Sequence, residues 1–349
     1  MAWPINPRHF ARDHLRRRRR LVRSYWAGSL LSGGLILLLA GCGGAPADHA
    51  SEGRLPVFAG IPPLAYLVEQ IGAEHVKVDA LVQPGQDPHT FEPTPQEIVA
   101  LGKAVIFFKI GMPFETVLLE KVREGNPRLM VVDATRGVER RPMEASGCVE
   151  AAGGSRHPEP EAGEPDPHVW LSLPLLKIQA ENIAAGLSQA DPPHQRDYRQ
   201  NLRALLGRLD TLHRRLLRML APYRGRSFYV FHPGFGYFAD AYGLKQEAVE
   251  AGGRSPTPQQ LRALIEKAQA EGVKTIFVQP QYAPQSAAVV AEAIGGQIVP
   301  INGLGKNVIA DIEDMATKIE RALSLEKVQG SRPKVQGTKF MRRESKPVL

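Results

Sequence analysis

Residues 191–220 read DPPHQRDYRQNLRALLGRLDTLHRRLLRML, and this stretch decides how the chain is organised. Leucines recur in it at steps of three and four residues, with arginines on the opposite side: Leu202, Leu205, Leu206, Leu209, Leu212 and Leu216. That spacing predicts one amphipathic helix over residues 195–221, and a helix of ~25 residues is ~38 Å long. Because the stretch lies between two sets of predicted strands, we expect a rigid helix that joins two lobes. A surface helix of a single lobe is the alternative.

Short β-rich apolar runs alternate with helical patterns on both sides of this segment. Four precede residue 140 and four follow residue 226: 55–61, 76–82, 104–108, 129–133, 227–231, 246–250, 274–278 and 297–301. Helical patterns lie between them, at 63–73, 95–102, 113–124, 234–242, 258–271, 284–294 and 307–325. Continuous apolar runs suit parallel strands covered on both faces. We therefore predict an α/β fold of two similar lobes, residues 54–194 and 222–325, each a parallel four-stranded sheet with flanking helices.

Composition excludes several classes of protein. The chain of 349 residues is 43% hydrophobic and 23% charged, which is ordinary for a globular protein. Of its net charge of +8, residues 1–41 carry +7 and residues 326–349 carry +5, which leaves −4 on the body between them. We therefore expect no nucleic-acid partner. The two cysteines, Cys42 and Cys148, exclude a disulfide-rich scaffold and a cysteine-only zinc site.

The first 41 residues are typical of an export signal. An arginine cluster at residues 16–23 precedes 14 mainly apolar residues at 27–40, too few to span a bilayer comfortably. The sequence LAGC at 39–42 resembles a bacterial lipobox and predicts lipidation of the Cys42 thiol. An uncleaved anchor with an incidental cysteine is the alternative. Residues 42–53 predict a flexible tether, so we expect a protein that is lipid-anchored to the membrane and lies in the periplasm or cell envelope.

Two further segments lack apolar periodicity. Residues 140–167 hold six carboxylates among several Gly and Pro residues and predict a mobile acidic loop. Within it, we expect Cys148 to be an inert thiol and His157 to collect metal weakly at most. Residues 326–349 predict a disordered basic tail.

Three histidines fall in loops stiffened by proline. His89 lies in the loop after the second predicted strand, His232 directly follows the strand 227–231, and His168 follows the acidic loop in DPHVW. Ligands of open parallel sheets bind at the carboxyl ends of strands, and three imidazoles with one more donor are a common zinc set. A single histidine is more often structural, but three in such loops predict a metal site.

The sequence lacks three common motifs of enzymes. It contains no GxSxG, no phosphate-binding GxxxxGK and no HExxH, so we expect a binding protein and not an enzyme. A metal-assisted hydrolase remains an alternative, with Glu92 as its candidate general base. We expect the remaining histidines of the body, His75, His194 and His213, to be solvated.

Several motifs together carry a resemblance. In order, they are the lipobox, PGQDPHTFEPTP at 84–95, the acidic loop, DPHVWLS at 166–172, FHPGFGYF at 231–238, SPTP at 255–258 and IFVQP at 276–280. They resemble the metal-specific substrate-binding lipoproteins of ABC importers, in their zinc-uptake branch, over residues 54–325. The resemblance implies two lobes joined by a long helix, metal at their interface, small closure movements, and delivery to a permease powered by an ATPase subunit.

The resemblance also implies the ligands. His89, His168 and His232 match the first three metal ligands of the family. Manganese-selective members tend to have a carboxylate where this chain has His232, so Zn²⁺ is expected as the transported ligand ahead of Mn²⁺. Asn302 stands where a fourth ligand, often Asp, is found, and it is our candidate beside Glu92 or water. Without that carboxylate the site charge would stay near +2.

Two other functions remain open at this point. One is a manganese- or iron-binding uptake protein of the same family. The other is a metal-stabilised adhesin or interaction lipoprotein. In the favoured interpretation the protein is a monomer that binds zinc through three histidines and docks on its permease.

Overall fold

The structure is a computed structural model, and it describes residues 53–143, 165–250, 256–282 and 285–330. The predicted signal at residues 1–41, Cys42, most of the tether and most of the acidic loop, with Cys148 and His157, lie outside the described residues. So does the predicted tail beyond residue 330. Within the described residues, no helix is long and apolar enough to cross a membrane.

The N-terminal lobe is a parallel four-stranded sheet flanked by helices. Its strands are β1 (Leu55–Ala59), β2 (Val76–Ala80), β3 (Ile106–Lys109) and β4 (Met130–Asp133), in the order β2-β1-β3-β4. Its helices are α1 (Pro62–Gly72), α2 (Pro95–Leu101) and α3 (Pro113–Gly125). Proline at the start of each helix removes a backbone N–H that would have no partner there. The register pairs Leu55 with Val76, so β1 and β2 end together beside the loop that carries His89.

The C-terminal lobe repeats this topology. Its strands are β5 (Ser227–Val230), β6 (Lys245–Ala248), β7 (Thr275–Val278) and β8 (Gln297–Pro300), in the order β6-β5-β7-β8. Its helices are α6 (Gly236–Tyr242), α7 (Pro258–Ala270), α8 (Gln285–Ala293) and α9 (Val308–Gly330). All pairs in both sheets are parallel. The prediction of two similar lobes with parallel four-stranded sheets is confirmed.

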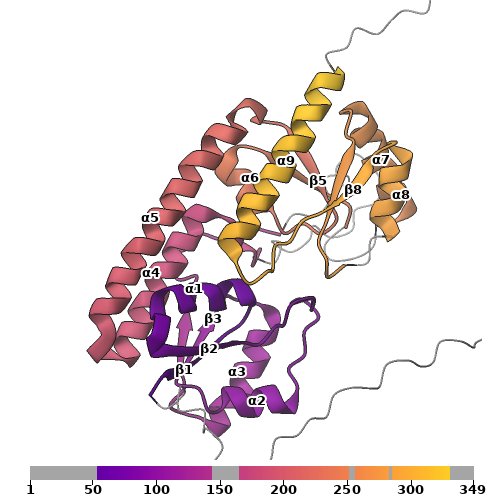
Figure 1. The fold of residues 1–349 in the computed structure, drawn as a ribbon. Coiled ribbons are helices and arrows are strands. Elements are labelled where there is room, and N and C mark those ends of the chain that lie inside the picture. The colour runs from indigo at the N-terminus through magenta and orange to yellow at the C-terminus, as the bar shows by residue number, and fades with distance from the viewer. Residues whose placement is uncertain (1–52, 144–164, 251–255, 283–284, 331–349) are drawn as a thin grey trace, which may run out of the picture. The chain divides into compact units, whose positions relative to one another are not determined.

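Helices α4 (Leu173–Ala190) and α5 (Gln195–Leu220) separate the two sheets in the chain. Helix α5 contacts α1 of the N-terminal lobe and also α6 and α9 of the C-terminal lobe, so the predicted joining helix is present (Figure 1). Its buried face is formed by Tyr198, Leu205, Leu209, Leu212, Leu216 and Leu220. The predicted leucines Leu202 and Leu206 lie at the edge of this face and are only partly buried.

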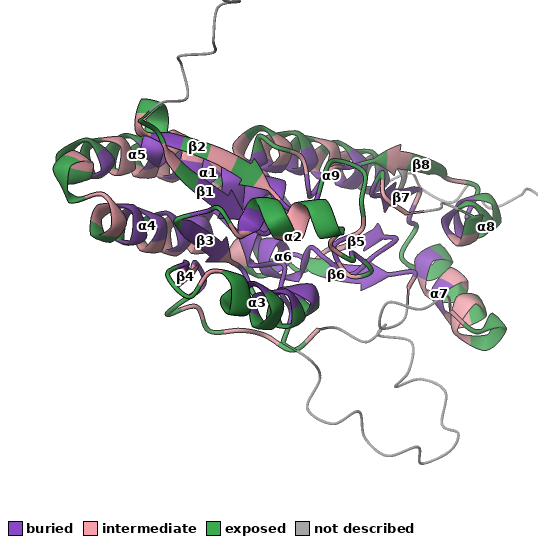
Figure 2. Cartoon of the chain, turned by 90° about the horizontal axis from the view of Figure 1, so that it is seen from below, coloured by how far each residue is buried: buried purple, intermediate pink, exposed green. Residues whose placement is uncertain are grey.

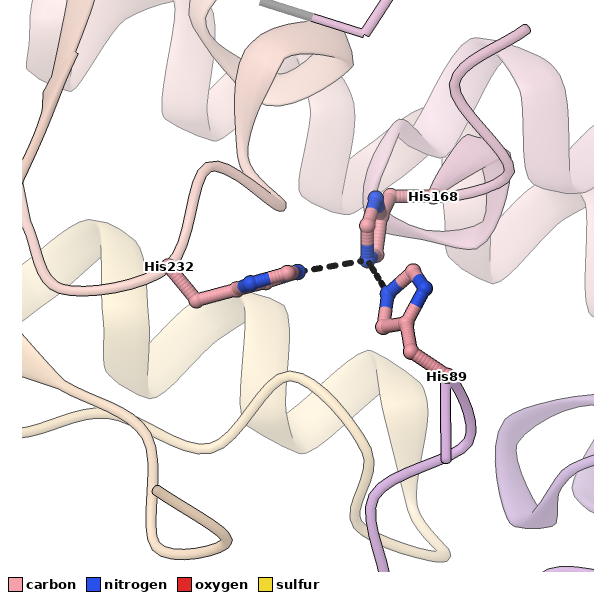
Figure 3. Close-up of side chains that lie close together, drawn as sticks. All are labelled: His89, His168 and His232. Carbon is pink, nitrogen blue, oxygen red and sulfur yellow. Dashed lines mark hydrogen bonds between the residues drawn. The ribbon is translucent and has the colours of Figure 1, made fainter. Parts of the chain in front are cut away.

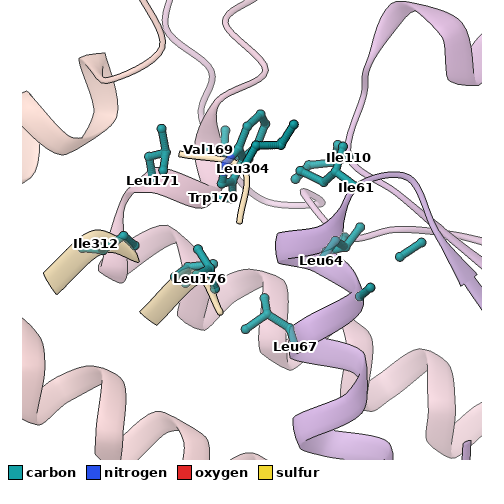
Figure 4. Packing of buried hydrophobic residues seen from close by; sticks show 14 of the residues in the cluster. Ile61, Leu64, Leu67, Ile110, Val169, Trp170, Leu171, Leu176, Leu304 and Ile312 are labelled. Atoms are coloured by element: carbon teal, nitrogen blue, oxygen red, sulfur yellow. The ribbon is translucent and has the colours of Figure 1, made fainter. Parts of the chain in front are cut away.

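One hydrophobic cluster extends through both lobes. Figure 4 shows its centre, where residues of the N-terminal lobe, of the segment after His168 and of the C-terminal lobe lie close together: Ile61, Leu64, Ile110, Val169, Trp170, Leu171, Leu304 and Ile312. The indole nitrogen of Trp170 donates to the carbonyl oxygen of Gly303 at 2.6 Å. Figure 2 shows that β1, β3, β5 and β7, the central strands of the two sheets, are largely buried, whereas β8 at the edge of its sheet is largely exposed. This shared core gives the segment at residues 168–171 a fixed place beside both sheets.

The C-terminal helix corrects one predicted boundary. Helix α9 ends at Gly330, whereas the sequence pattern placed the start of a disordered tail at residue 326. Glu326 is buried, and its Oε1 accepts a hydrogen bond from the backbone N–H of Lys274 at 3.0 Å. Its other oxygen lies 3.5 Å from the guanidinium of Arg226. A charged residue in a weakly apolar stretch thus holds the last turns of the helix against the lobe.

Candidate metal centre

His89 lies in the loop between β2 and α2. Its backbone N–H donates to Oδ1 of Asp87 at 3.0 Å, and the hydroxyl of Thr90 donates to the other Asp87 oxygen at 3.3 Å. The next helix begins with a capping box, in which Thr94 and Glu97 bond to each other's backbone. These local bonds fix a loop that has no regular structure of its own, and His89 itself is half-buried.

His168 immediately precedes the short helix η2 (Val169–Leu171), which joins the N-terminal lobe to α4. Its backbone N–H and its Nδ1 both lie within hydrogen-bond distance of Oδ1 of Asp166, at 2.9 and 2.7 Å. Asp166 and His168 are only 1% and 4% exposed. The carbonyl oxygen of Asp166 accepts from the hydroxyl of Tyr237, which ties this segment to α6 of the other lobe.

His232 follows β5, at the carboxyl end of that strand. Its Nδ1 lies 2.7 Å from Oε2 of Glu250, and the side-chain amide of Gln279 bonds to both its backbone N–H and its carbonyl oxygen. A Cβ atom on Gly234 would lie 3.1 Å from the ring of His168, so glycine at this position lets the His232 loop approach that ring closely.

The three predicted histidines converge. Nε2 of His168 lies 3.2 Å from Nε2 of His89 and 3.3 Å from Nε2 of His232 (Figure 3). One ligand atom of each residue lies within 4.8 Å of those of the other two. Zinc bound tetrahedrally at about 2.0–2.1 Å from each nitrogen would separate pairs of nitrogens by roughly 3.3–3.4 Å. The two nitrogen–nitrogen distances to His168 therefore suit ligation of one such ion.

A buried carboxylate, Asp166, and a half-buried one, Glu250, decide which ring nitrogen of His168 and of His232 faces the centre. An ionised carboxylate only accepts hydrogen bonds, so Asp166 and Glu250 hold the proton of His168 and His232 on Nδ1. Nε2 of each ring then presents its lone pair to the centre. A carboxylate behind a histidine also makes the imidazole a stronger metal ligand.

Burial keeps these imidazoles uncharged. It lowers the pKa of His89, His168 and His232 below the ordinary histidine value of 6.5. The hydrogen bonds to Asp166 and Glu250 oppose this effect on His168 and His232 without reversing it. The three rings are therefore neutral at pH 7, which is the form that binds metal.

Three carboxylates lie near the histidines, and their negative charge was not expected from the sequence. Without an aspartate at position 302 the site charge was expected to stay near +2. Asp87, Asp166 and Glu250 all lie close enough to the histidines to raise the pKa of His89 against the effect of burial. The centre is therefore surrounded by negative charge one layer outside the ligands. The roles of Asp166 and Glu250 were not predicted from the sequence, although Asp166 stands in the DPH motif and Glu250 ends a predicted strand.

The two candidates for a fourth ligand lie differently from the histidines. Oδ1 of Asn302 accepts a hydrogen bond from the backbone N–H of Leu304 at 3.0 Å, as in a turn. Glu92 is exposed at the surface. Asn302 and Glu92 are therefore less buried than His168 and His232.

Two histidines that were expected to be solvated, His75 and His194, form a stacked pair. The side chain of His194 is 41% exposed, so of this pair only His75 departs from the expectation. His75 stacks on His194 with ring centroids 3.9 Å apart, and the side chain of His75 is only 17% exposed. Asp197 lies 3.1 Å from Nε2 of His75, and Asp191 lies 2.7 Å from Nδ1 of His194. This pair ties η1 (Ala73–His75), the short helix after α1, to the turn between α4 and α5.

Comparison with known proteins shows the family. A sequence profile of the family described as "Zinc-uptake complex component A periplasmic" matches residues 57–322. The chain belongs to this family. Members of the family are substrate-binding transport proteins and not enzymes.

Individual relatives of the zinc-uptake family differ in the metal they are named for. The high-affinity zinc uptake system protein ZnuA of Bacillus subtilis is 28% identical over 80% of this chain and 88% of its own length. The manganese-binding lipoprotein MntA of the same organism is 27% identical over 74% of this chain and 85% of its own length. A crystal structure of ZnuA matches with 34% identity and a TM-score of 0.70 over 77% of this chain and 99% of the other.

Proposed function

We propose that this protein is the substrate-binding component of a zinc importer and that His89, His168 and His232 hold the Zn²⁺ ion. The observation that carries the proposal is the convergence of three Nε2 atoms, with nitrogens 3.2 and 3.3 Å from that of His168. The names of its zinc-binding relatives support the same cargo.

The choice of zinc over manganese rests on the donor set. Imidazole is a preferred ligand of zinc, whereas manganese favours carboxylate and water oxygens. Three neutral nitrogens and no carboxylate among the convergent ligand atoms favour the softer ion. The fourth ligand in this proposal is water, because the oxygen of Asn302 accepts from Leu304 and Glu92 is exposed.

The site lies between the lobes, which suits capture and release. His89 belongs to the N-terminal lobe and His232 to the C-terminal lobe, so a small separation of the lobes takes ligands away from the ion. Delivery is to an ABC permease and its ATPase, the partners with which this family works. We further propose that the chain acts as a monomer, held at the membrane of the periplasm by a lipid on Cys42 and the tether at residues 42–53.

A competition titration tests the proposal. The purified protein is stripped of metal with a chelator and titrated with zinc against a fluorescent zinc indicator, with and without excess manganese. We expect one zinc per chain, not displaced by manganese, and at least tenfold weaker binding in His232→Ala. His213→Ala, which removes an imidazole on α5 instead, is the matched control. Weak or multiple binding that is indifferent to His232 would refute the proposal.

A genetic test addresses transport. Disruption of the gene is expected to cause a growth defect under zinc limitation that added zinc reverses. A defect that only manganese reverses would favour the manganese branch of the family.

A further inference from the structure

Tyr282 covers the metal centre from the side of the C-terminal lobe. It follows β7 by four residues, and its ring stacks on the imidazole of His232 with centroids 4.7 Å apart and planes inclined by 25°. Tyr282 and Pro88, from opposite lobes, line one pocket together with His168 and His232. The aromatic face thus lies directly against one of the three proposed ligands.

The hydroxyl of Tyr282 reaches across to the other lobe. It donates to Oδ1 of Asp87 at 3.3 Å, and the same oxygen accepts the backbone N–H of His89 at 3.0 Å. A single carboxylate oxygen therefore joins the loop that carries His89 to the residue that covers His232. Burial and the nearby carboxylates Asp87 and Glu250 raise the pKa of Tyr282, so its hydroxyl keeps the proton that it donates.

Three other contacts between the lobes do not hold the His89 loop, and one of them is the bond from the Tyr237 hydroxyl to the carbonyl oxygen of Asp166. The indole of Trp170 bonds to Gly303 within the shared hydrophobic core. The ion pair of Lys306 with Glu69 lies at the surface, with the lysine side chain 64% exposed, and exposed pairs of this kind stabilise little. The contact of Tyr282 with Asp87 joins the loop that carries His89 to the residue that stacks on His232.

We propose that Tyr282 is a latch that sets the rate at which the lobes open and the ion leaves, an inference that rests on the proposed function. Tyr282 is a positioning residue in this scheme, because its hydroxyl bonds to Asp87 and its ring stacks on His232. Separation of the lobes moves Tyr282 away from Asp87, so the hydrogen bond must break before the ion is released. Entry of an ion needs the same opening, so the latch slows binding and release together and changes the affinity little.

Tyr282→Phe removes the hydroxyl and keeps the ring that stacks on His232. The effect of one hydrogen bond of about 1 kcal/mol corresponds to roughly fivefold in a rate. We therefore expect zinc release to be roughly fivefold faster, with the dissociation constant changed by less than about twofold. Tyr223→Phe is the matched control, because the Tyr223 hydroxyl donates to the Glu320 carboxylate at 3.0 Å within the C-terminal lobe.

Stopped-flow measurement separates the possible outcomes. Zinc-loaded wild type, Tyr282→Phe and Tyr223→Phe are mixed with excess chromogenic chelator at a concentration where release limits the rate, and affinities come from the equilibrium titration. An unchanged release rate in Tyr282→Phe overturns the latch, and so does a release rate and a dissociation constant that rise by the same factor. A wild type that binds no zinc would instead refute the proposed function, and the latch with it.

A double-mutant cycle identifies the partner. Asp87→Ala removes the acceptor, so Tyr282→Phe is expected to accelerate release no further in that background. An undiminished fivefold effect in the Asp87→Ala protein would overturn the assignment of Asp87 as the other half of the latch.

Discussion

Replacing Asp166 by asparagine tests whether the carboxylate behind His168 contributes to metal affinity. The asparagine oxygen can still accept from the backbone N–H and Nδ1 of His168, which Asp166 contacts at 2.9 and 2.7 Å, so the change removes charge and keeps shape. The carboxylate would lie roughly 6 Å from an ion bound at Nε2, taking a zinc–nitrogen distance of about 2.0 Å. Attraction between charges of +2 and −1 at that distance is about 1.4 kcal/mol in water and about 5.5 kcal/mol at an effective dielectric constant of 20.

The expected loss of affinity lies within that range. Loss of a residue that supports a metal-bound histidine typically weakens binding by about 10–100-fold, and we expect roughly 30-fold, or about 2 kcal/mol, for Asp166→Asn. The assay is the competition titration with zinc at pH 7. Asp314→Asn, which removes one carboxylate from α9 on the surface, controls for the change in total charge. An affinity for zinc in Asp166→Asn within twofold of wild type would show that the charge of this carboxylate does not contribute to metal binding.

Two further predictions concern pH and the C-terminal helix. Because burial lowers the pKa of His89, His168 and His232 below 6.5, protons compete with zinc only below that pH. Zinc titrations from pH 8 to 5 should therefore show constant affinity down to about pH 6.5 and weaker binding below it. A loss of affinity that begins above pH 7 would contradict this prediction. Glu326→Ala leaves the N–H of Lys274 without its acceptor, so urea unfolding should show a loss of about 1–2 kcal/mol in the free energy of unfolding. Zinc affinity should not change in that variant, and an unchanged unfolding curve would mean that the last turns of α9 contribute nothing to stability.

The sequence was sufficient for the architecture because each element has a strong local signal. All eight predicted strands form, and α5 begins at residue 195 as the leucine spacing predicts. The central strands β1, β3, β5 and β7 are largely buried and give continuous apolar runs that are hard to mistake. The end of α9 was not predicted, because it has no strong local signal in the sequence. Glu326 gives no apolar signal, and its contacts with Lys274 and Arg226 are distant in sequence.

For the site, too, the residues with a local sequence signal were predicted and those without one were not. Proline-bounded loops at the ends of strands pointed to the three histidines, and the structure brings them together. The partners behind them were not predicted, because a carboxylate's role depends on which side chain it meets after folding. Glu250 meets His232 across 18 residues of chain and Tyr282 meets Asp87 across 195, and no spacing rule covers such distances.

The position of the negative charge has a consequence for how the ion is held. A carboxylate that ligates zinc directly lowers the charge of the site and must itself be displaced at release. Here the nearby carboxylates Asp166 and Glu250 bond to Nδ1 of the histidines and leave the ion to neutral nitrogens. From about 6 Å they would attract the proposed cation without contacting it. Release then requires the breaking of nitrogen–metal bonds as the lobes part, and no rearrangement of a buried charge. In the proposed function, such a centre attracts a divalent cation without a ligating carboxylate, and the contact between Tyr282 and Asp87 then sets the release rate.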